Sequence, residues 1–191
     1  MLQFEDIYIQ LVDTPPIDNL STQGRLYGLL RMSDVLAVVV DLSQDSISQV
    51  RDSFRALEEW GFVLLGSVDN EEEHDGESDK PVIVVGNKAD LQDSLDTFQA
   101  LESEFGDSYP VVLVSAEEEV GFDELGEAIF RALDIIRVYT KSPQEKKDDV
   151  QRGAPFVLPQ GSTVADASDN VHKDLARSLK YAVLWGLSGK F

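Results

Sequence analysis

The sequence of 191 residues contains no cysteine, and it has only two methionines and two histidines. Without cysteine the chain can form no disulfide, no thiolate metal site and no cysteine nucleophile. No apolar run approaches the roughly 18 residues that a membrane helix needs. The first residues, 1–6, lack the pattern of a signal peptide. The sequence therefore predicts a soluble, cytosolic protein.

Basic residues are also scarce, because 16 Lys and Arg stand against 36 Asp and Glu, which gives a formal net charge of −20. Residues 1–134 hold 30 acids and 7 bases, a balance of −23, whereas residues 135–191 hold 6 acids and 9 bases, a balance of +3. The acid surplus excludes a protein whose whole surface coats nucleic acid or an anionic membrane. The change of sign predicts a domain boundary and a different partner for each part.

Apolar segments alternate with helical patterns over residues 1–134. The runs 35–40 and 82–85 are apolar throughout, which is typical of strands buried on both faces of a parallel sheet. Strands that alternate with helices predict βα units around such a sheet. The expected strands cover residues 7–12, 35–40, 82–85 and 111–114, the expected helices cover 20–33, 45–60, 94–105 and 121–133, and 62–68 is a short strand or an ordered loop.

The pattern changes after residue 134. Strands are expected at 135–140 and 155–158, and a helix is expected from Ser162 and Thr163 to about residue 179. Residues 181–185 are apolar and expected to be extended. The order of two strands, a helix and a strand predicts a small α+β module.

The segment Asn87-Lys88-Ala89-Asp90 directly follows a buried strand. An Asp carboxylate can accept hydrogen bonds from N1–H and N2–H of guanine together, and adenine offers no such pair of donors. The Lys stem can lie over the purine, and the Asn amide can reach N7 or brace the neighbouring loop. The alternative is a solvated turn after a strand, because a four-residue pattern alone is weakly specific.

Two more segments are expected at ends of strands of the same sheet, where ligands of such folds bind. Ser115-Ala116 follows the strand 111–114 and would supply a backbone N–H to O6 of guanine. Asp13, after the strand 7–12, could hold a magnesium ion through water.

These motifs resemble those of the Obg-like and developmentally regulated (DRG) GTP-binding proteins, of the translation-factor class. The third, fourth and fifth motifs of that family correspond to 13–16, 87–90 and 115–116. The tail resembles a TGS domain, a small β-grasp module, through segments 136–141, 155–158, 161–164, 171–174 and 180–182. The resemblance implies a partial P-loop GTPase-like sheet flanked by helices, followed by the TGS domain.

The resemblance also implies roles for the site residues and a set of ligands. Asp90 would read the guanine edge, Lys88 would stack on it, Asn87 would brace it, and Ser115 with Ala116 would contact O6. The expected ligands are GTP or GDP, with magnesium bound weakly or not at all. The family's partners imply an association with the ribosome or RNA through the TGS domain.

The sequence departs from the family in two places. Pro16 stands where the third motif has a Gly whose N–H meets the γ-phosphate, and Pro has no N–H to give. No Gly-x-x-x-x-Gly-Lys-Ser/Thr occurs in the 191 residues. We therefore expect residues 1–134 to be a partial G domain without P-loop and switch I, and residues 135–191 to be a TGS domain without its last strand. Such a chain is expected not to hydrolyse GTP by itself.

Two further expectations concern partners. The family's sheet has a strand between the segments 7–12 and 34–41, so these two either close onto each other or are joined by a strand of another chain. The alternative function is an RNA- or protein-interaction module without a nucleotide, acting through the TGS domain. Its candidate RNA-facing residues are Lys141, Lys146, Lys147, Arg152, Lys173, Arg177 and Lys180.

Overall fold

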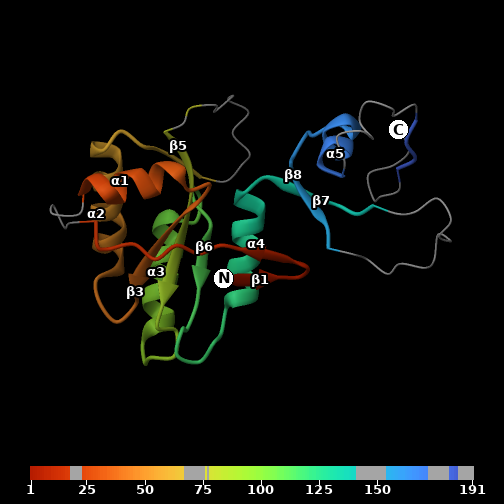
Figure 1. Ribbon diagram of the computed structural model, residues 1–191. Helices are drawn as coiled ribbons and strands as arrows, with labels where there is room; N and C mark the ends of the chain where they lie inside the picture. The colour runs from red at the N-terminus through yellow and green to blue at the C-terminus, as the bar shows by residue number, and fades with distance from the viewer. Residues whose placement is uncertain (18–22, 67–75, 77, 141–153, 172–180, 185–191) are drawn as a thin grey trace. The chain divides into compact units, whose positions relative to one another are not determined.

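A computed structural model describes residues 1–17, 23–66, 76, 78–140, 154–171 and 181–184. The chain divides into two compact units, Met1–Asp134 and Ile135–Phe191 (Figure 1). The first contains β1 (Leu2–Phe4), β2 (Ile7–Ile9), α1 (Gln23–Met32), β3 (Leu36–Asp41), α2 (Ser46–Glu59), β4 (Val63–Leu65), β5 (Asp79–Asn87), α3 (Ser94–Phe105), β6 (Val111–Leu113) and α4 (Phe122–Ala132). The second contains β7 (Ile135–Val138), β8 (Phe156–Pro159) and α5 (Val164–Val171).

A parallel sheet with β5 at its centre organises the first unit. The strands β3, β4 and β6 each pair with β5 in parallel. The register places Leu36 opposite Val82 and Asp41 opposite Asn87. Residues 82–86 of β5 are all buried, as expected of a strand covered on both faces. The predicted parallel sheet with flanking helices is thereby confirmed.

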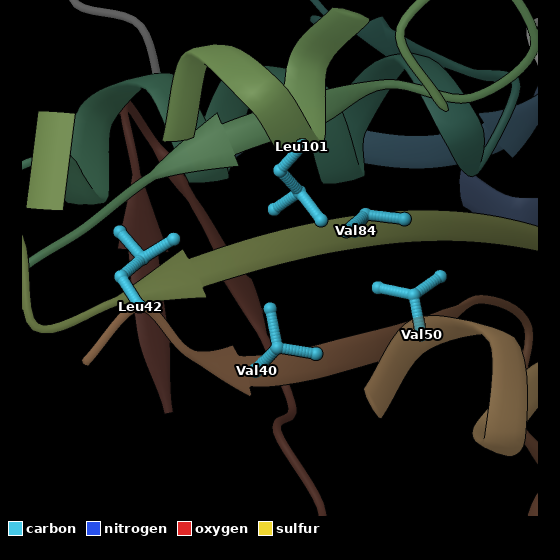
Figure 2. Packing of buried hydrophobic residues seen from close by; sticks show 5 residues of the cluster. All are labelled: Val40, Leu42, Val50, Val84 and Leu101. Carbon is cyan, nitrogen blue, oxygen red and sulfur yellow. The ribbon is translucent and has the colours of Figure 1, made fainter. Parts of the chain in front are cut away.

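The main core lies between this sheet and the helices α2 and α3. Figure 2 shows Val40 and Val84 on β3 and β5 pointing toward Val50 of α2 and Leu101 of α3, with Leu42 beside them. Val50, Val84 and Leu101 are completely buried. These residues come from two strands and two helices. Their packing therefore holds the C-terminal ends of β3 and β5 in place.

The N-terminal segment forms a hairpin instead of a parallel strand. β1 and β2 pair antiparallel, with Leu2 opposite Ile9, across a turn in which Glu5 has a φ of 50°. The strand expected over 7–12 is present over Ile7–Ile9, but its expected place in the parallel sheet was wrong, because the adjacent β1 supplies a local partner. The hairpin packs on α4, where the ring centroids of Phe4 and Phe130 are 5.6 Å apart.

A buried lysine joins α1 to the beginning of β5. Lys80, only 7% exposed, donates hydrogen bonds from Nζ to the carbonyl oxygens of Arg31 and Ser33, both at 2.8 Å. The last carbonyls of a helix have no partner within the helix, and the helix dipole favours a cation there. Lys80 satisfies both requirements at the C-terminus of α1.

The second unit is an antiparallel pair with one helix. β7 pairs with β8 so that Ile135 lies opposite Pro159. Asp166 accepts hydrogen bonds at 2.7 Å from the N–H and the hydroxyl of Thr163, and Thr163 Oγ1 accepts from the Asp166 N–H at 3.3 Å. This reciprocal cap begins α5. The expected continuation of the helix over 172–179 lies outside the described residues.

Residues 181–184 form no strand, whereas the expected order of elements ends in a strand at 181–185, whose last residue lies outside the described residues. Tyr181 is 83% exposed and no strand of the described residues pairs with this segment. An apolar run therefore was not sufficient to predict a strand. No helix among the described residues is long and apolar enough to cross a membrane.

Candidate guanine-nucleotide site

The ends of β5 and β6 bring two of the sequence motifs together. Asn87 is the last residue of β5, and Ser115 lies two residues beyond β6. The Val114 N–H donates to the Gly86 carbonyl at 2.8 Å, and the Ala89 N–H donates to the Val114 carbonyl at 3.0 Å. The parallel pairing thus continues past the strand ends and fixes the two loops side by side.

Asn87 bridges the two loops with its side chain. Its Oδ1 accepts a hydrogen bond from the Ala116 N–H at 3.1 Å. The sequence left two roles open for Asn87, to reach N7 of the purine or to brace the neighbouring loop. The hydrogen bond to Ala116 corresponds to bracing. The same Ala116 N–H is the donor expected for O6 of guanine, so it already has a protein partner.

Asp90 is held by a hydroxyl group from the second loop. Ser115 Oγ donates to Asp90 Oδ1 at 2.5 Å and accepts from the Glu118 N–H at 3.1 Å. Ser115 is 2% exposed whereas Asp90 is exposed. Within the described part of the chain, Oδ2 of Asp90 accepts no hydrogen bond. The hydrogen bond at Oδ1 therefore orients the carboxylate, and Oδ2 can accept hydrogen bonds from a ligand.

The loop is stabilised at its base as well. Ser94, buried at the beginning of α3, donates from Oγ to the Ala89 carbonyl at 2.8 Å. Ser115 and Val120 exchange two backbone hydrogen bonds of 3.0 Å, which close the loop after β6. Both loops are thus tied to the sheet by backbone bonds, so the polar side chains at their tips have defined positions.

Lys88 points to an acidic partner that the sequence did not single out. Its Nζ lies 2.6 Å from Oδ2 of Asp41, the last residue of β3. Hydrogen bonds from Lys88, and then from Ser43, lower the pKa of Asp41 to about 2. A signal for Asp41 exists in the sequence, because it ends an apolar strand as Asn87 does. That signal predicts only a polar residue at the same edge.

Asp13 belongs to no strand of the parallel sheet. It follows β2 by four residues in irregular structure, and it is exposed. Its expected position at the end of a parallel strand was wrong, because β2 belongs to the hairpin. The described residues hold no group of three His, Cys, Asp or Glu that could bind a metal ion. Asp13 alone does not fit a magnesium site, so such a role needs further oxygen ligands.

Comparison with known proteins adds three findings. A family model described as "TGS domain" matches residues 136–190. An uncharacterized GTP-binding protein of Methanocaldococcus jannaschii is 30% identical over 191 residues, which are 97% of this chain and 46% of that protein. Developmentally-regulated G-protein 3 of Arabidopsis thaliana is 27% identical over 196 residues, covering 98% of this chain and 49% of that protein.

A solved structure of a GTP binding protein from Pyrococcus horikoshii OT3 has the same fold, with a TM-score of 0.55. It is 18% identical, and the match covers 78% of this chain and 71% of that one. The chain thus spans about half the length of the two relatives that it matches over nearly its whole extent. The predicted resemblance is confirmed: this chain is related to the GTP-binding proteins of the developmentally regulated type and carries a TGS domain at residues 136–190.

Proposed function

We propose that this chain binds a guanine nucleotide at the ends of β5 and β6. The observation that carries the proposal is the hydrogen-bonded cluster of Asp90, Ser115, Asn87 and Ala116, which come from two loops. A solvated turn needs no such cross-loop bonds. The names of the relatives, one a GTP-binding protein and the other a G-protein, support the same ligand.

Each residue of the cluster has a role that its geometry supports. The Asp90 carboxylate accepts N1–H and N2–H of guanine, because an ionised carboxylate has about four lone-pair sites and Ser115 occupies one. The Lys88 stem covers one face of the purine. Asn87 keeps the two loops together by accepting from the Ala116 N–H, and O6 of guanine would take over this donor. The site therefore selects guanine over adenine by the donors of its Watson–Crick edge.

The proposal for this 191-residue chain does not include GTP hydrolysis. Phosphoryl transfer depends on positioning and on stabilising charge at the phosphates. The sequence contains no phosphate-binding loop, and Pro16 has no N–H for a γ-phosphate. If magnesium takes part, nucleotide phosphates must supply ligands beside Asp13, because the described residues form no metal cluster.

The direct experiment is calorimetric titration of the chain with GDP, ADP and IDP. We expect GDP to bind more tightly than ADP, and also more tightly than IDP, which lacks the 2-amino donor. Asp90→Asn should weaken GDP binding by about 10- to 100-fold, because hydrogen bonds to a charged group contribute about 1.5–3 kcal/mol each.

The matched control is Asp96→Asn, which removes the same charge from an exposed position in the first turn of α3. It should leave GDP affinity and the preference over IDP unchanged. Equal binding of GDP and ADP, or no binding at millimolar ligand, would contradict the proposal. If the chain hydrolysed GTP and Asp90→Asn abolished this activity, the expectation that the chain does not hydrolyse GTP would be contradicted.

The second candidate function is RNA or ribosome binding through the TGS domain, in the cytoplasm. The balance of +3 over residues 135–191 favours it, against −23 over residues 1–134. RNA binding that weakens steeply with salt and survives Asp90→Asn would assign the RNA contact to the tail.

We also propose that a strand of a partner pairs with the edge of β3. Among the described residues β3 pairs only with β5, and Val39 on it is 61% exposed. A further strand beside β3 would pair its free backbone groups and cover apolar surface. Protection of β3 amides from hydrogen exchange on adding a partner would support this proposal.

A further inference from the structure

Asp41 is the acidic residue that the roles above leave unexplained. It ends β3 directly opposite Asn87, and its carboxylate faces the loop that follows β5. We propose that Asp41 is a positioning residue of the guanine site: it fixes the Lys88 ammonium at the rim, so that the methylene stem is the surface offered to the purine. This inference rests on the proposed guanine site and adds the residue that arranges one of its walls.

Hydrogen bonds from Ser43 and Gln44 hold the Asp41 carboxylate in addition to its contact with Lys88. Oδ1 accepts from the Ser43 N–H at 2.9 Å and from the Ser43 hydroxyl at 2.6 Å, and Oδ2 accepts from Gln44 Nε2 at 3.1 Å. The Asp41 N–H donates to Gln49 Oε1 at 3.0 Å. The side chain of Asp41 is 20% exposed, and that of Lys88 is 47% exposed. A fixed and largely covered carboxylate can therefore orient a flexible, more exposed lysine.

The backbone places the two residues so that this pair forms. The Leu42 N–H donates to the Asn87 carbonyl at 3.1 Å, which continues the β3–β5 pairing beyond Asp41. Lys88 follows with a φ of 73°, a left-handed conformation that a lysine rarely adopts. The Lys88 backbone is thus turned at the strand end, and the ammonium then lies 2.6 Å from Asp41.

The pair changes what Lys88 can do for a ligand. A lysine side chain loses more rotamer freedom on ordering than most residues do. The ion pair orders this side chain before a nucleotide arrives, so less of that loss remains for the binding step. The lowered pKa of Asp41, caused first by its hydrogen bond with Lys88, agrees with a charged pair in neutral solution.

The experiment is a double-mutant cycle on GDP affinity, measured by calorimetry on the full chain. Asp41→Asn should weaken GDP binding about three- to tenfold. Without Asp41 the Lys88 side chain is ordered only when the nucleotide binds, and this range corresponds to the rotamer entropy that it then loses. In a Lys88→Gln background the same change should alter affinity by less than about twofold, because Asp41 acts through Lys88.

Asp45→Asn is the matched control, since it removes the same charge four residues away and Asn also caps helices well. It should leave GDP affinity unchanged in both backgrounds. Three results would overturn the inference: an equal loss from Asp41→Asn in both backgrounds, no loss in the wild-type background, or tighter GDP binding.

A second measurement separates this inference from the proposed function. Carboxyl NMR titration of the nucleotide-free chain should give Asp41 a pKa near the value of about 2, and Lys88→Gln should raise it. An unchanged pKa shows that the pair is absent and overturns the inference, whether or not GDP binds. If the pair is present but wild type binds no guanine nucleotide, the proposed function fails instead.

Discussion

Three aspartates near the edge of the first unit's sheet have different surroundings. Asp45 caps α2 by accepting from the Ser48 N–H at 3.1 Å and from the Ser48 hydroxyl at 2.7 Å, and these bonds lower its pKa. Asp41 accepts from Lys88, and Asp90 accepts from Ser115. A carboxylate that caps a helix is used by the fold, whereas the exposed Asp90 keeps acceptor capacity for a ligand.

The Asp41–Lys88 pair predicts a pH dependence of folding stability. The pKa of Asp41 falls from 3.8 to about 2 on folding, so its charged form stabilises the folded state above about pH 4 and this stabilisation is lost as the pH falls toward 2. We expect the difference in unfolding free energy between wild type and Asp41→Asn to be constant from about pH 5 to 7. It should shrink below about pH 4.

Urea unfolding at several pH values measures this difference. Lys88→Gln serves as the comparison, since it removes the first cause of the lowered pKa and should reduce the acid sensitivity in the same range. A difference between wild type and Asp41→Asn that does not change between pH 7 and pH 2 would contradict the prediction.

The sequence predicted the part of the candidate site that lies at the ends of the parallel strands. Asn87 ends β5 and Ser115 comes two residues after β6, so their common edge follows from the parallel sheet. Asp41 was missed, because its role depends on the 2.6 Å contact with Lys88 across two strands. Asp13 was misplaced, because the partner of its strand depends on a turn at Glu5 that the pattern did not reveal.

At the scale of elements, the Lys80 contact joins the end of α1 to the beginning of β5. Lys80→Met removes the donor and leaves the Arg31 and Ser33 carbonyls without this buried ammonium. We expect it to lower the free energy of unfolding by about 1.5–3 kcal/mol, the range for hydrogen bonds to charged groups. Urea denaturation measures the change.

The control is Arg55→Met, which removes an exposed cation paired with Asp52 on the surface of α2. Surface pairs contribute little, so its effect should stay within about 0.5 kcal/mol. Similar values for the two variants would show that burial of Lys80 does not matter for stability.

The turn before α4 depends on a glycine. Gly121 has a φ of 84°, and a Cβ there would lie 2.1 Å from the Leu113 carbonyl oxygen. Gly61 has a φ of 86° and nothing within 4 Å of such a Cβ. We expect Gly61→Ala to cost about 1–2 kcal/mol for its left-handed backbone. Gly121→Ala should cost about 1–3 kcal/mol more, because Leu113 has to move.

Thermal or urea unfolding of both variants tests this prediction. Because Gly121 adjoins Val120, which pairs with Ser115, the Gly121 variant should also disturb the NMR signals of Ser115. Equal costs for the two glycines would show that the carbonyl contact is relieved without strain.

The elements that the sequence predicted well are those with a strong local pattern. The helices expected at 45–60 and 94–105 appear as α2 and α3 within one residue at each end. Both have apolar faces that meet the sheet in one core. The hairpin at residues 2–9 and the irregular segment at 181–184 were not predicted, because a short apolar run does not reveal which segment it will pair with, or whether it will pair at all.

At the scale of the whole molecule, charge is distributed unequally between the two units. The balance of −23 over residues 1–134 means that like charges repel one another in the folded first unit. Raising sodium chloride from about 0.01 M to 0.15 M shortens the screening length from about 30 to 8 Å. We therefore expect the urea midpoint of the chain to rise over this range.

The control variant replaces Glu117 and Glu119, both exposed, with glutamine. It carries less negative charge in the loop after β6, so its midpoint should depend less on salt. A midpoint that falls with added salt would show that specific ion pairs, such as Arg51–Glu104, outweigh the general repulsion.

The hydrogen bond between Asn87 Oδ1 and the Ala116 N–H has a consequence for the energetics of ligand binding. A guanine O6 that takes this donor replaces an existing partner and adds no bond to the total count. The exchange releases little net heat, and its free energy depends on where the displaced Asn87 oxygen finds a new donor. Discrimination between bases then arises at Asp90, and the contact at O6 adds little to the affinity for guanine.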